Sequence, residues 1–429
     1  MTEDFDTLRV LCELLEPGII SDQPYALARV EDKTVVMLSQ MNGEQWDGLV
    51  SEAYRQDLAP LLQTFLTRQA DPHSLALPLK EKLKQTYLIT AAQNTLALHN
   101  AKTLLTAFQR AGIPAAGLKG VYLLEQIYPD IGARSMNDID LLIKKQDLPK
   151  CLAVMQEMGY QTVTYFSLAD ENIDTKHVPP MKKAGGPLVE LHWTLLEEDE
   201  PFTIDADAIW QRTVPARIAN VDALALGVED LILHLCLHLT YQHYLNLGLR
   251  GLMDIALVIN KFSTEIDWLR LVEIAQSWGA ERVTALTLKL VETQLNVPIP
   301  AEVFHALIPE GIEPTLLENA RSQLLERVRF EDHFTPDLVE MSASKNLFSK
   351  LKIGLQRVFI PRLALARIYN VPPKSPRIMG LYWVRLWYLI RSYGKTVIRL
   401  QRGEAGTKPA HQKAEISISL HEWMSPHKN

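Results

Sequence analysis

The chain has 429 residues, of which 47% are hydrophobic and 22% charged, and this balance excludes a disordered or a fibrous protein. Its three cysteines lie far apart, which excludes a disulfide framework and a four-cysteine zinc site and fits a reducing compartment. The acidic N-terminus lacks the features of a signal peptide and no stretch has the composition of a membrane span, so we expect a cytoplasmic protein without a transmembrane segment.

Residues 1–112 predict a helical region. Apolar side chains recur at intervals of three and four from Leu98 to Phe108, which indicates one buried helix face. Gly112, followed by an Ile-Pro pair, is typical of a helix end.

Residues 113–215 predict a compact centre in which short strands alternate with helices. In chain order we expect a strand at 115–118, a helix at 120–128, a strand at 138–143, a helix capped by Asp147 up to Gly159, and a strand at 188–195. Residues 160–187 read as irregular. This order indicates an α+β fold, in which a small, βαβ-like mixed-sheet core is embedded in a mainly helical protein.

Two further regions follow the predicted core. Residues 216–330 read as a helical domain, with Asp267 as the N-cap of one helix. Residues 331–429 read as a basic helical region that ends in a flexible tail.

Three carboxylates stand out in the two longer predicted strands. Asp138 and Asp140 are two residues apart, so both point to the same side of their strand. Such a pair on an apolar strand is unfavourable without a cation, and Mg²⁺ takes one or two carboxylates together with phosphate oxygens. Glu190 and His192 share one face of the second strand, opposite Val189. If the strands are neighbours, Asp138, Asp140 and Glu190 form a site for one or two Mg²⁺ ions, although aspartates at this spacing are also common on surfaces.

Lys119 and Gly120 lie between the first predicted strand and the following helix. The backbone amides at a helix N-terminus favour anions, glycine permits close approach, and lysine adds a positive charge. The GxxxxGK[ST] phosphate-binding pattern is absent. Arg134 is either a bidentate phosphate clamp or the partner of a catalytic carboxylate, and the sequence favours neither.

These motifs resemble the uncharacterised nucleotidyltransferase family of the polymerase-β-like nucleotidyltransferase superfamily. The resemblance covers roughly residues 40–300 and includes the segments LILHLCLHL and GLRGLMDIALVI. The wider superfamily carries Gly-Gly or Gly-Ser at the phosphate-binding turn, close before the paired acids. This chain has Lys-Gly there, and 17 residues separate Gly120 from Asp138. The positions that match the family pattern are Leu118, Lys119, Gly120, Arg134, Asp138, Asp140, Glu190, His192 and Trp193.

The residues and the resemblance together imply a Mg²⁺-dependent enzyme that moves a nucleoside monophosphate from a nucleoside triphosphate, with ATP expected, to an acceptor hydroxyl. The metal ligands would be Asp138, Asp140 and Glu190, and the groups that position the triphosphate Lys119, Gly120 and Arg134. His192 would accept a proton, bind a phosphate or orient a carboxylate. The acceptor is open among a protein, a peptide, a tRNA and a small molecule. The alternatives are a phosphotransferase that uses the same metal site and a noncatalytic nucleotide-binding or regulatory protein.

Other polar residues carry weaker signals. His234 and His238 share one helix face, but the HExxH pattern is absent, so we expect buried, hydrogen-bonded histidines rather than a zinc site. His177 precedes a Pro-Pro pair in the irregular segment and is a weak candidate for the active site. Arg250 and Asp254 lie at i and i+4 and are expected to pair with each other.

Charge is unevenly distributed along the chain. The net charge is −7, yet residues 342–403 contain 13 Lys or Arg and no Asp or Glu. Such a block suggests an anionic partner, and its interleaved aromatic residues, among them Trp383 and Trp387, suit single-stranded nucleic acid or a membrane interface. We prefer the plainer interpretation, in which the aromatic residues are buried on a core and the cations are scattered in solvent.

Overall fold

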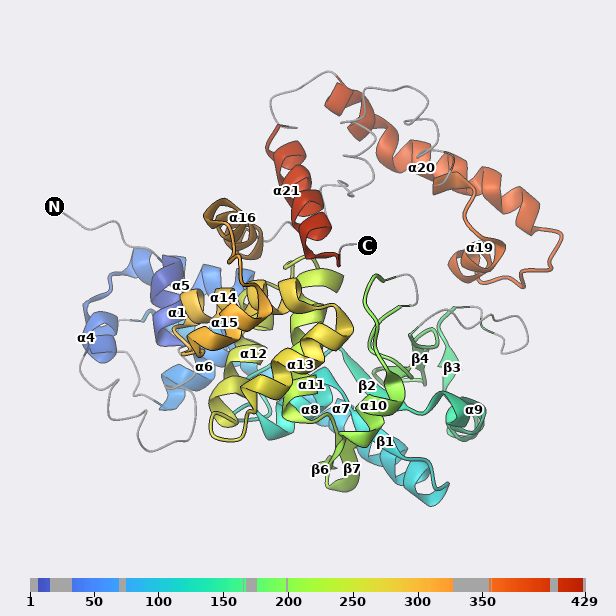
Figure 1. The fold of residues 1–429 in the computed structure, drawn as a ribbon, viewed down its shortest axis with the longest axis horizontal. Helices are drawn as coiled ribbons and strands as arrows, with labels where there is room; N and C mark the ends of the chain where they lie inside the picture. Colours follow the sequence, from blue (N-terminus) through green and yellow to red (C-terminus); the bar gives the residue numbers. More distant parts are fainter. Residues whose placement is uncertain are drawn as a thin grey trace.

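The computed structural model describes most of the chain as an α+β protein (Figure 1). The residues that it describes are 7–15, 33–68, 75–164, 166, 176–197, 200–326, 355, 357–401 and 408–426.

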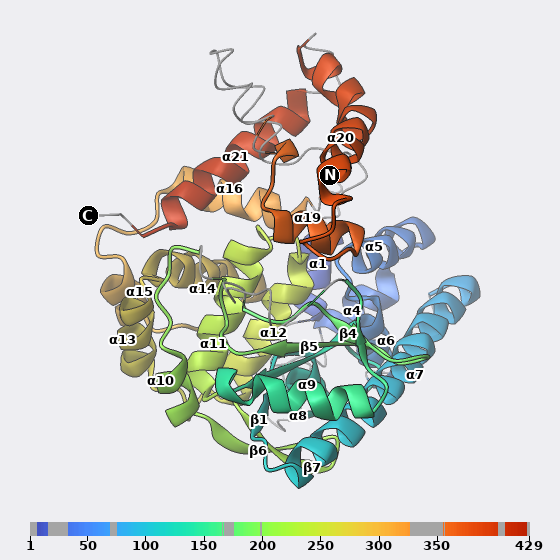
Figure 2. The same cartoon turned by 90° about the vertical axis from the view of Figure 1, so that its right-hand side faces the viewer.

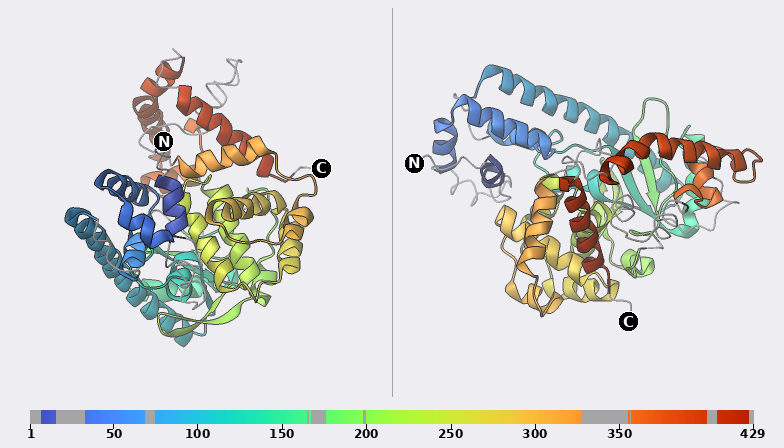
Figure 3. Two further views of the ribbon diagram at one scale, coloured as in Figure 1. Left: turned by 90° about the vertical axis from the view of Figure 1, so that its left-hand side faces the viewer. Right: turned by 90° about the horizontal axis from the view of Figure 1, so that it is seen from above.

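The N-terminal region is helical, as the sequence predicts. Its helices are α1 (Thr7–Leu14), α4 (Lys33–Gln40), α5 (Gly43–Arg55), α6 (Ala59–Arg68) and α7 (Leu77–Arg110). The end of α7 is set by Gly112, whose φ of 64° lies in the left-handed region that glycine adopts without strain. Helix α7 has 34 residues and contacts α5 and α6 as well as the sheet (Figures 2 and 3).

A seven-stranded mixed sheet forms the centre, in the order β3-β4-β5-β2-β1-β7-β6. Its strands are β1 (Ala115–Gly117), β2 (Asp138–Ile143), β3 (Gln161–Thr162), β4 (Met181–Lys182), β5 (Leu188–His192), β6 (Val214–Ile218) and β7 (Val221–Ala225). Between them lie α8 (Lys119–Gln126), η1 (Lys145–Asp147), α9 (Leu148–Glu157) and α10 (Ala206–Gln211). The predicted strands and helices of the centre are therefore present, and the α+β class is confirmed.

Three details of the centre differ from the sequence prediction. Residues 160–187, expected to be irregular, contain the short strands β3 and β4. β1 and β2 are antiparallel, so they do not form a βαβ unit, and the parallel partner of β2 is β5. The expectation of helix from residue 216 was wrong, because β6 and β7 form an antiparallel hairpin that adds to the sheet beside β1. Its two-residue turn, Ala219-Asn220, has φ of 52° and 62°, as the tight turns that join twisted strands require. We therefore propose that the sheet domain ends at Ala225 rather than at residue 215.

A helical domain follows the sheet. Its elements are α11 (Val228–Cys236), the π-helical turn η3 (Leu237–Gln242), α12 (Gly248–Lys261), α13 (Trp268–Trp278), α14 (Glu281–Leu295), α15 (Ala301–Leu307) and α16 (Pro314–Leu325). The predicted cap of α13 is confirmed, since the side chain of Asp267 accepts a hydrogen bond from the backbone N–H of Arg270. One continuous core joins this domain to the sheet and to the N-terminal helices.

The C-terminal part contains α19 (Arg362–Tyr369), α20 (Ile378–Gln401) and α21 (Lys408–Met424). The sequence predicts a flexible linker at residues 403–415, but α21 begins within it, at Lys408. Further along this helix, Leu420 and Met424 are buried in the main core beside α14 and α16. Residues 342–354, 356 and 402–403 of the basic block lie outside the described residues. Among the described helices, none is long and apolar enough to cross a bilayer.

Candidate active site

The register of β2 and β5 brings the predicted site together. The two strands are parallel neighbours, and Asp140 pairs with Glu190 while Leu142 pairs with His192. The alternate residues Val189 and Leu191 are fully buried on the opposite face, as the sequence pattern predicts. The side chains of Asp140, Glu190 and His192 therefore lie on one face of the sheet.

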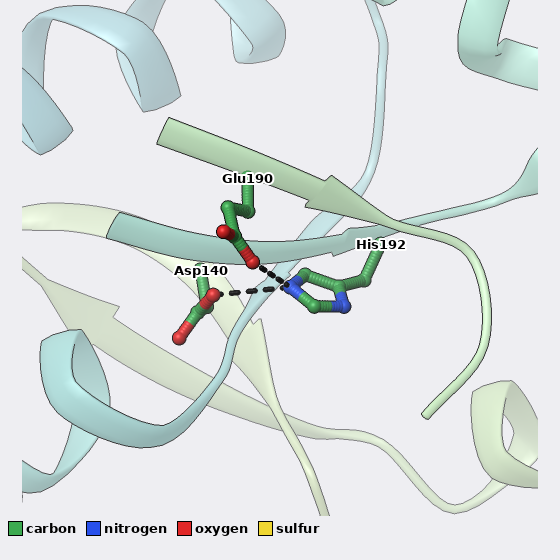
Figure 4. A group of neighbouring side chains, drawn as sticks. All are labelled: Asp140, Glu190 and His192. Carbon is green, nitrogen blue, oxygen red and sulfur yellow. Dashed lines mark hydrogen bonds and ion pairs between the residues drawn. The ribbon is translucent and has the colours of Figure 1, made fainter. Parts of the chain in front are cut away.

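His192 bridges two carboxylates (Figure 4). Its Nε2 lies 3.0 Å from Asp140 Oδ1 and 3.3 Å from Glu190 Oε2. Because both partners are acceptors, Nε2 carries the proton. One ligand atom from each of the three residues lies within 4.8 Å of the others, which is close enough to hold a metal ion.

Lys119 contributes the positive charge next to this cluster. Its Nζ lies 3.3 Å from Asp140 Oδ2, and the backbone N–H of Leu118 donates to the carbonyl oxygen of Asp140 at 3.0 Å. The φ of Lys119 is 39°, a left-handed conformation that is strained for lysine. The turn between β1 and α8 therefore places an ammonium group directly on a carboxylate of the site.

The three carboxylates differ in their electrostatic surroundings. Burial favours the neutral form of Asp140, but the Lys119 ammonium and the hydrogen bond from His192 hold its pKa well below the usual range. Burial also favours the neutral form of Glu190, but the hydrogen bond from His192 and the charges of His177 and His192 together lower its pKa. In contrast, burial and the negative charge of Asp140 raise the pKa of Asp138 to about 6. Asp138 stands outside the cluster of three ligand groups, at the start of β2.

Gly120 lies at the start of α8, as predicted, and both Gly120 and Arg134 make buried packing contacts. The Arg134 guanidinium is buried and makes two hydrogen bonds to Asp254 on α12, at 2.7 and 2.8 Å. Its ion-pair partner is therefore Asp254 rather than Asp138, Asp140 or Glu190, and two of its three nitrogens already donate to that carboxylate. Gly120 is buried, and a Cβ atom there would lie 2.9 Å from Met136 and 3.2 Å from Arg134, so glycine is required for packing in this structure.

The segment that leads into β2 is held from two sides. The amide of Asn94 on α7 donates to the carbonyl oxygens of Ile131 and Arg134, each at 2.7 Å. Asp254 also accepts a hydrogen bond of 2.7 Å from the Tyr128 hydroxyl. The expected ion pair between Arg250 and Asp254 was wrong, because Arg134 supplies the guanidinium that binds Asp254, whereas Arg250 lies 3.9 Å from Asp57.

Three histidine side chains lie beside the site, one from α11, one from η3 and one from the residue that follows η3. The rings of His234 and His238 are stacked with centroids 6.0 Å apart, and His243 packs edge-on against His238 at 4.4 Å. Burial, and then the Lys119 ammonium, lower the pKa of His234 and His238 well below the usual range, so both rings are neutral. The expectation of hydrogen-bonded histidines holds for His238, which contacts Gln242, but the buried Nε2 of His234 has no hydrogen-bond partner.

The segment before β4 also reaches the site. His177 forms an antiparallel bridge with His192, and the two rings lie 4.9 Å apart. Its Nε2 is 3.9 Å from Glu190 Oε2, which places this weak candidate at the edge of the cluster. Lys176 lies beside it, and burial together with the Lys119 charge lowers its pKa.

The sequence analysis missed Asp254 and Lys176 as neighbours of the site. Asp254 sits in a helix segment whose residues from Leu252 to Ile259 are otherwise apolar and buried. A carboxylate in such a segment requires a cationic partner, which was the available signal. Nothing in the local pattern around Lys176 indicates its position.

A cavity of about 670 Å³ lies beyond the C-terminal ends of β2 and β5. Trp193, which follows His192, is one of its lining residues, together with Lys144, Lys145 and Trp210. None of the three carboxylates lines it. The cluster of Asp140, Glu190 and His192 is therefore distinct from this cavity.

Comparison with known protein families identifies the class to which this chain belongs. Residues 42–296 match the family described as "Uncharacterised nucleotidyltransferase", which covers more than half of the chain. The chain belongs to this family, as its motifs indicate. No curated protein and no solved structure matches it.

Proposed function

We propose that this protein is a Mg²⁺-dependent nucleotidyltransferase, which transfers a nucleoside monophosphate from a nucleoside triphosphate, with ATP expected, to an acceptor hydroxyl. The observation that carries the proposal is the register of β2 and β5, which sets Asp140 beside Glu190 and leaves Asp138 two residues away on the same strand face. Membership of the nucleotidyltransferase family supports the same chemistry.

The donor set fits a divalent cation. Asp138, Asp140 and Glu190 offer carboxylate oxygens, the ligands that Mg²⁺ prefers, whereas a set that includes His192 would also suit Mn²⁺ or Zn²⁺. Asp138 has no ion-pair partner among the described residues, and burial together with the negative charge of Asp140 raises its pKa to about 6 in spite of the Lys119 charge. A cation bound at the three carboxylates would offset the burial of the Asp138 charge and its repulsion by Asp140.

The reaction would proceed by attack of the acceptor oxygen on the α-phosphorus, which forms one P–O bond while the bond to the pyrophosphate oxygen breaks. A bound Mg²⁺ ion supplies charge neutralisation on the phosphates and activation of the acceptor hydroxyl. Lys119 places a positive charge at the first residue of α8, where the helix N-terminus also favours phosphate. His192 holds the side chains of Asp140 and Glu190 in position. Catalysis by such a site depends mainly on positioning and on charge.

Labelled triphosphates distinguish this proposal from its alternatives. The purified chain is incubated with Mg²⁺ and with a triphosphate labelled either at the α- or at the γ-phosphorus, in the presence of a cell extract as a source of acceptors. Transfer of α-label to protein, RNA or small molecules supports nucleotidyl transfer. Transfer of γ-label alone indicates a phosphotransferase, and binding without transfer of either label indicates a noncatalytic nucleotide-binding protein.

A matched pair of variants connects the activity to the site. Asp140→Asn should abolish transfer, because it removes the carboxylate that contacts both Lys119 and His192. Asp222→Asn, at an exposed position of β7 in the same sheet, should leave transfer unchanged. Equal activity of the two variants would refute the site.

A further inference from the structure

Helices α19 and α20 form a hairpin that stands away from the sheet and from α11–α15 (Figures 1 and 2). The hairpin has a small core of its own, which consists of Leu365, Ala366 and Ile378 and is separate from the main core. Tyr382 and Arg385 tie α20 to the preceding segment by hydrogen bonds to the carbonyl oxygens of Ile360 and Arg357. One side of α20 is therefore used for packing within the hairpin.

The opposite side of α20 is apolar and exposed. Trp383 is 73% exposed and Trp387 is 60% exposed. At about 100° per residue, the exposed apolar positions span about half of the helix circumference. These positions are Met379, Trp383, Val384, Trp387, Tyr388 and Ile390, and we call them the apolar stripe of α20.

An exposed helix normally turns charged residues towards water. Between Ile378 and Arg391 the charged residues are two arginines, and the guanidinium of Arg391 lies over the ring of Trp387, 5.2 Å from its centroid. The preference for buried aromatic residues in this block was therefore wrong, since both tryptophans face outwards. A contiguous apolar surface of this kind marks an interaction site.

The charge around the stripe indicates what it contacts. Residues 357–391 contain no Asp or Glu. The exposed cations of the hairpin are Arg362, Lys374, Arg377 and Arg391. An anionic surface would be attracted to this hairpin, whereas a second copy of it would bring like charges together.

The side chains of the apolar stripe fit a lipid surface better than RNA. Tryptophan and tyrosine rings can stack on bases, but Met379, Val384 and Ile390 offer only aliphatic carbon and no hydrogen bond. A bilayer interface accepts aliphatic side chains in the acyl region, tryptophan and tyrosine at the boundary, and arginine at the headgroups. All members of the stripe thus find a partner at a lipid surface.

We propose that α20 is an interfacial helix that binds the surface of an anionic bilayer. The apolar stripe would lie in the boundary between headgroups and acyl chains, and the cations of the hairpin would contact anionic headgroups. The helix would lie in the plane of the interface, in keeping with the lack of any bilayer-spanning helix among the described residues. This places the nucleotidyltransferase core at a membrane surface.

Vesicle sedimentation of the full chain tests the proposal. The chain should sediment with vesicles of roughly three parts phosphatidylcholine and one part phosphatidylglycerol, and much less with phosphatidylcholine alone. Binding should weaken as salt is raised, because the attraction to the headgroups is screened. The double variant Trp383→Ser with Trp387→Ser should lower the partition coefficient about tenfold or more, since it removes the two largest apolar side chains of the stripe. Lys374→Glu with Arg377→Glu should lower binding to the anionic vesicles by about tenfold or more.

The matched control is Leu269→Ser on α13, where the leucine is 70% exposed but lies outside the hairpin. It should leave vesicle binding unchanged, and all variants should keep the wild-type melting temperature because the replaced side chains are exposed. Absence of vesicle binding, or equal binding by the tryptophan variant, overturns the proposal. Binding to a single-stranded RNA oligonucleotide without binding to vesicles would identify RNA as the occupant, and a dimer lost in the tryptophan variant would identify a second copy. These readouts do not depend on label transfer, so they are independent of the proposed activity.

Discussion

Asp138 differs from the other two carboxylates of the candidate site in its lack of a cationic partner among the described residues. Asp140 contacts Lys119 and His192, and Glu190 contacts His192. The raised pKa of Asp138, which burial and the Asp140 charge cause, shows that its ionised form costs free energy in the protein without metal. The ionised Asp138 therefore destabilises the metal-free protein, and a bound cation would remove this destabilisation.

Replacement of Asp138 should make the metal-free protein more stable but inactive. Asp138→Asn should raise the free energy of unfolding of the metal-free protein at pH 7 by about 1 to 3 kcal/mol, because a charge with a raised pKa is removed. The same variant should lose label transfer. Chemical denaturation in the presence of a chelator measures the first effect, and Asp222→Asn serves as the control for loss of a carboxylate. A destabilised or fully active Asp138→Asn protein would contradict this assignment.

The packing around Gly120 leaves no room for one additional carbon atom. Gly120→Ala should destabilise the protein by about 1 to 3 kcal/mol, since the new Cβ would overlap Met136 and approach the guanidinium of Arg134, which Asp254 holds in place. Gly380→Ala in the first turn of α20 is the matched control. It meets no atom within 4 Å and should be neutral or stabilising. Equal melting temperatures for the two variants would show that Met136 can move aside.

At the scale of elements, α11 and η3 present two neutral histidines to the site. A π-helical turn is uncommon and occurs often at functional sites, and here η3 begins directly after α11. His234 and His238 are held neutral by burial and by the Lys119 charge. Lys119, at the start of α8, thus acts on the carboxylates of β2 and on the histidines of α11 and η3.

These histidines should make the protein sensitive to acid. Their pKa values are lower in the folded than in the unfolded chain, so below pH about 6.5 the unfolded chain binds protons that the folded chain does not. The free energy of unfolding should fall by about 1 to 3 kcal/mol per pH unit as the pH drops below that value. Asp138 has the opposite effect. Below its pKa of about 6 the folded chain binds a proton there that the unfolded chain does not, which stabilises the folded protein and offsets the effect of one of the two histidines.

The acid sensitivity is measured by denaturation of the metal-free protein between pH 8 and pH about 5.5. His234→Gln should reduce the slope by about one proton, whereas His99→Gln, at an exposed position of α7, should leave it unchanged. A slope that His234→Gln does not alter would mean that this ring is protonated in the folded protein.

At the scale of the whole molecule, buried polar contacts tie the sheet to the helices on both sides. Arg134 and Tyr128 bind Asp254 of α12, and Asn94 of α7 holds the backbone of the same loop. The start of β2, and with it Asp138, is thus positioned by the N-terminal helices and by the helical domain together.

Loss of one member of this network should be costly. Asp254→Asn would leave the Arg134 charge buried and is expected to lower the free energy of unfolding by about 3 to 5 kcal/mol. The double replacement Arg134→Met with Asp254→Leu should cost less than the single one, because no unpaired charge remains. The control is Glu318→Gln in the exposed pair with Arg321, where little change is expected. A single variant that is no less stable than the double one would show that the charge pair is not what holds the loop.

Local patterns were sufficient to predict β1, β2, β5 and the helices α8 and α9, but not the other strands of the sheet. The strand at Asp138–Ile143 was located with its correct bounds, because a short apolar run between turn residues needs no distant partner to be recognised. Alternation along a strand also placed Glu190 and His192 on one face. The hairpin of β6 and β7 was missed, since its short, weakly apolar strands are recognisable mainly through their pairing with β1.

The sequence by itself determined the class of the fold, the family and the two strands that carry the carboxylates, since these depend on periodicity and on motifs within short segments. Only the tertiary structure decided that Asp140 lies beside Glu190, that Arg134 binds Asp254 and that Trp383 and Trp387 face outwards. Each of these depends on contacts between residues far apart in the chain or on which helix face remains uncovered. A side chain's own segment does not encode its distant partner, because burial and ion pairing are settled only when the elements pack together.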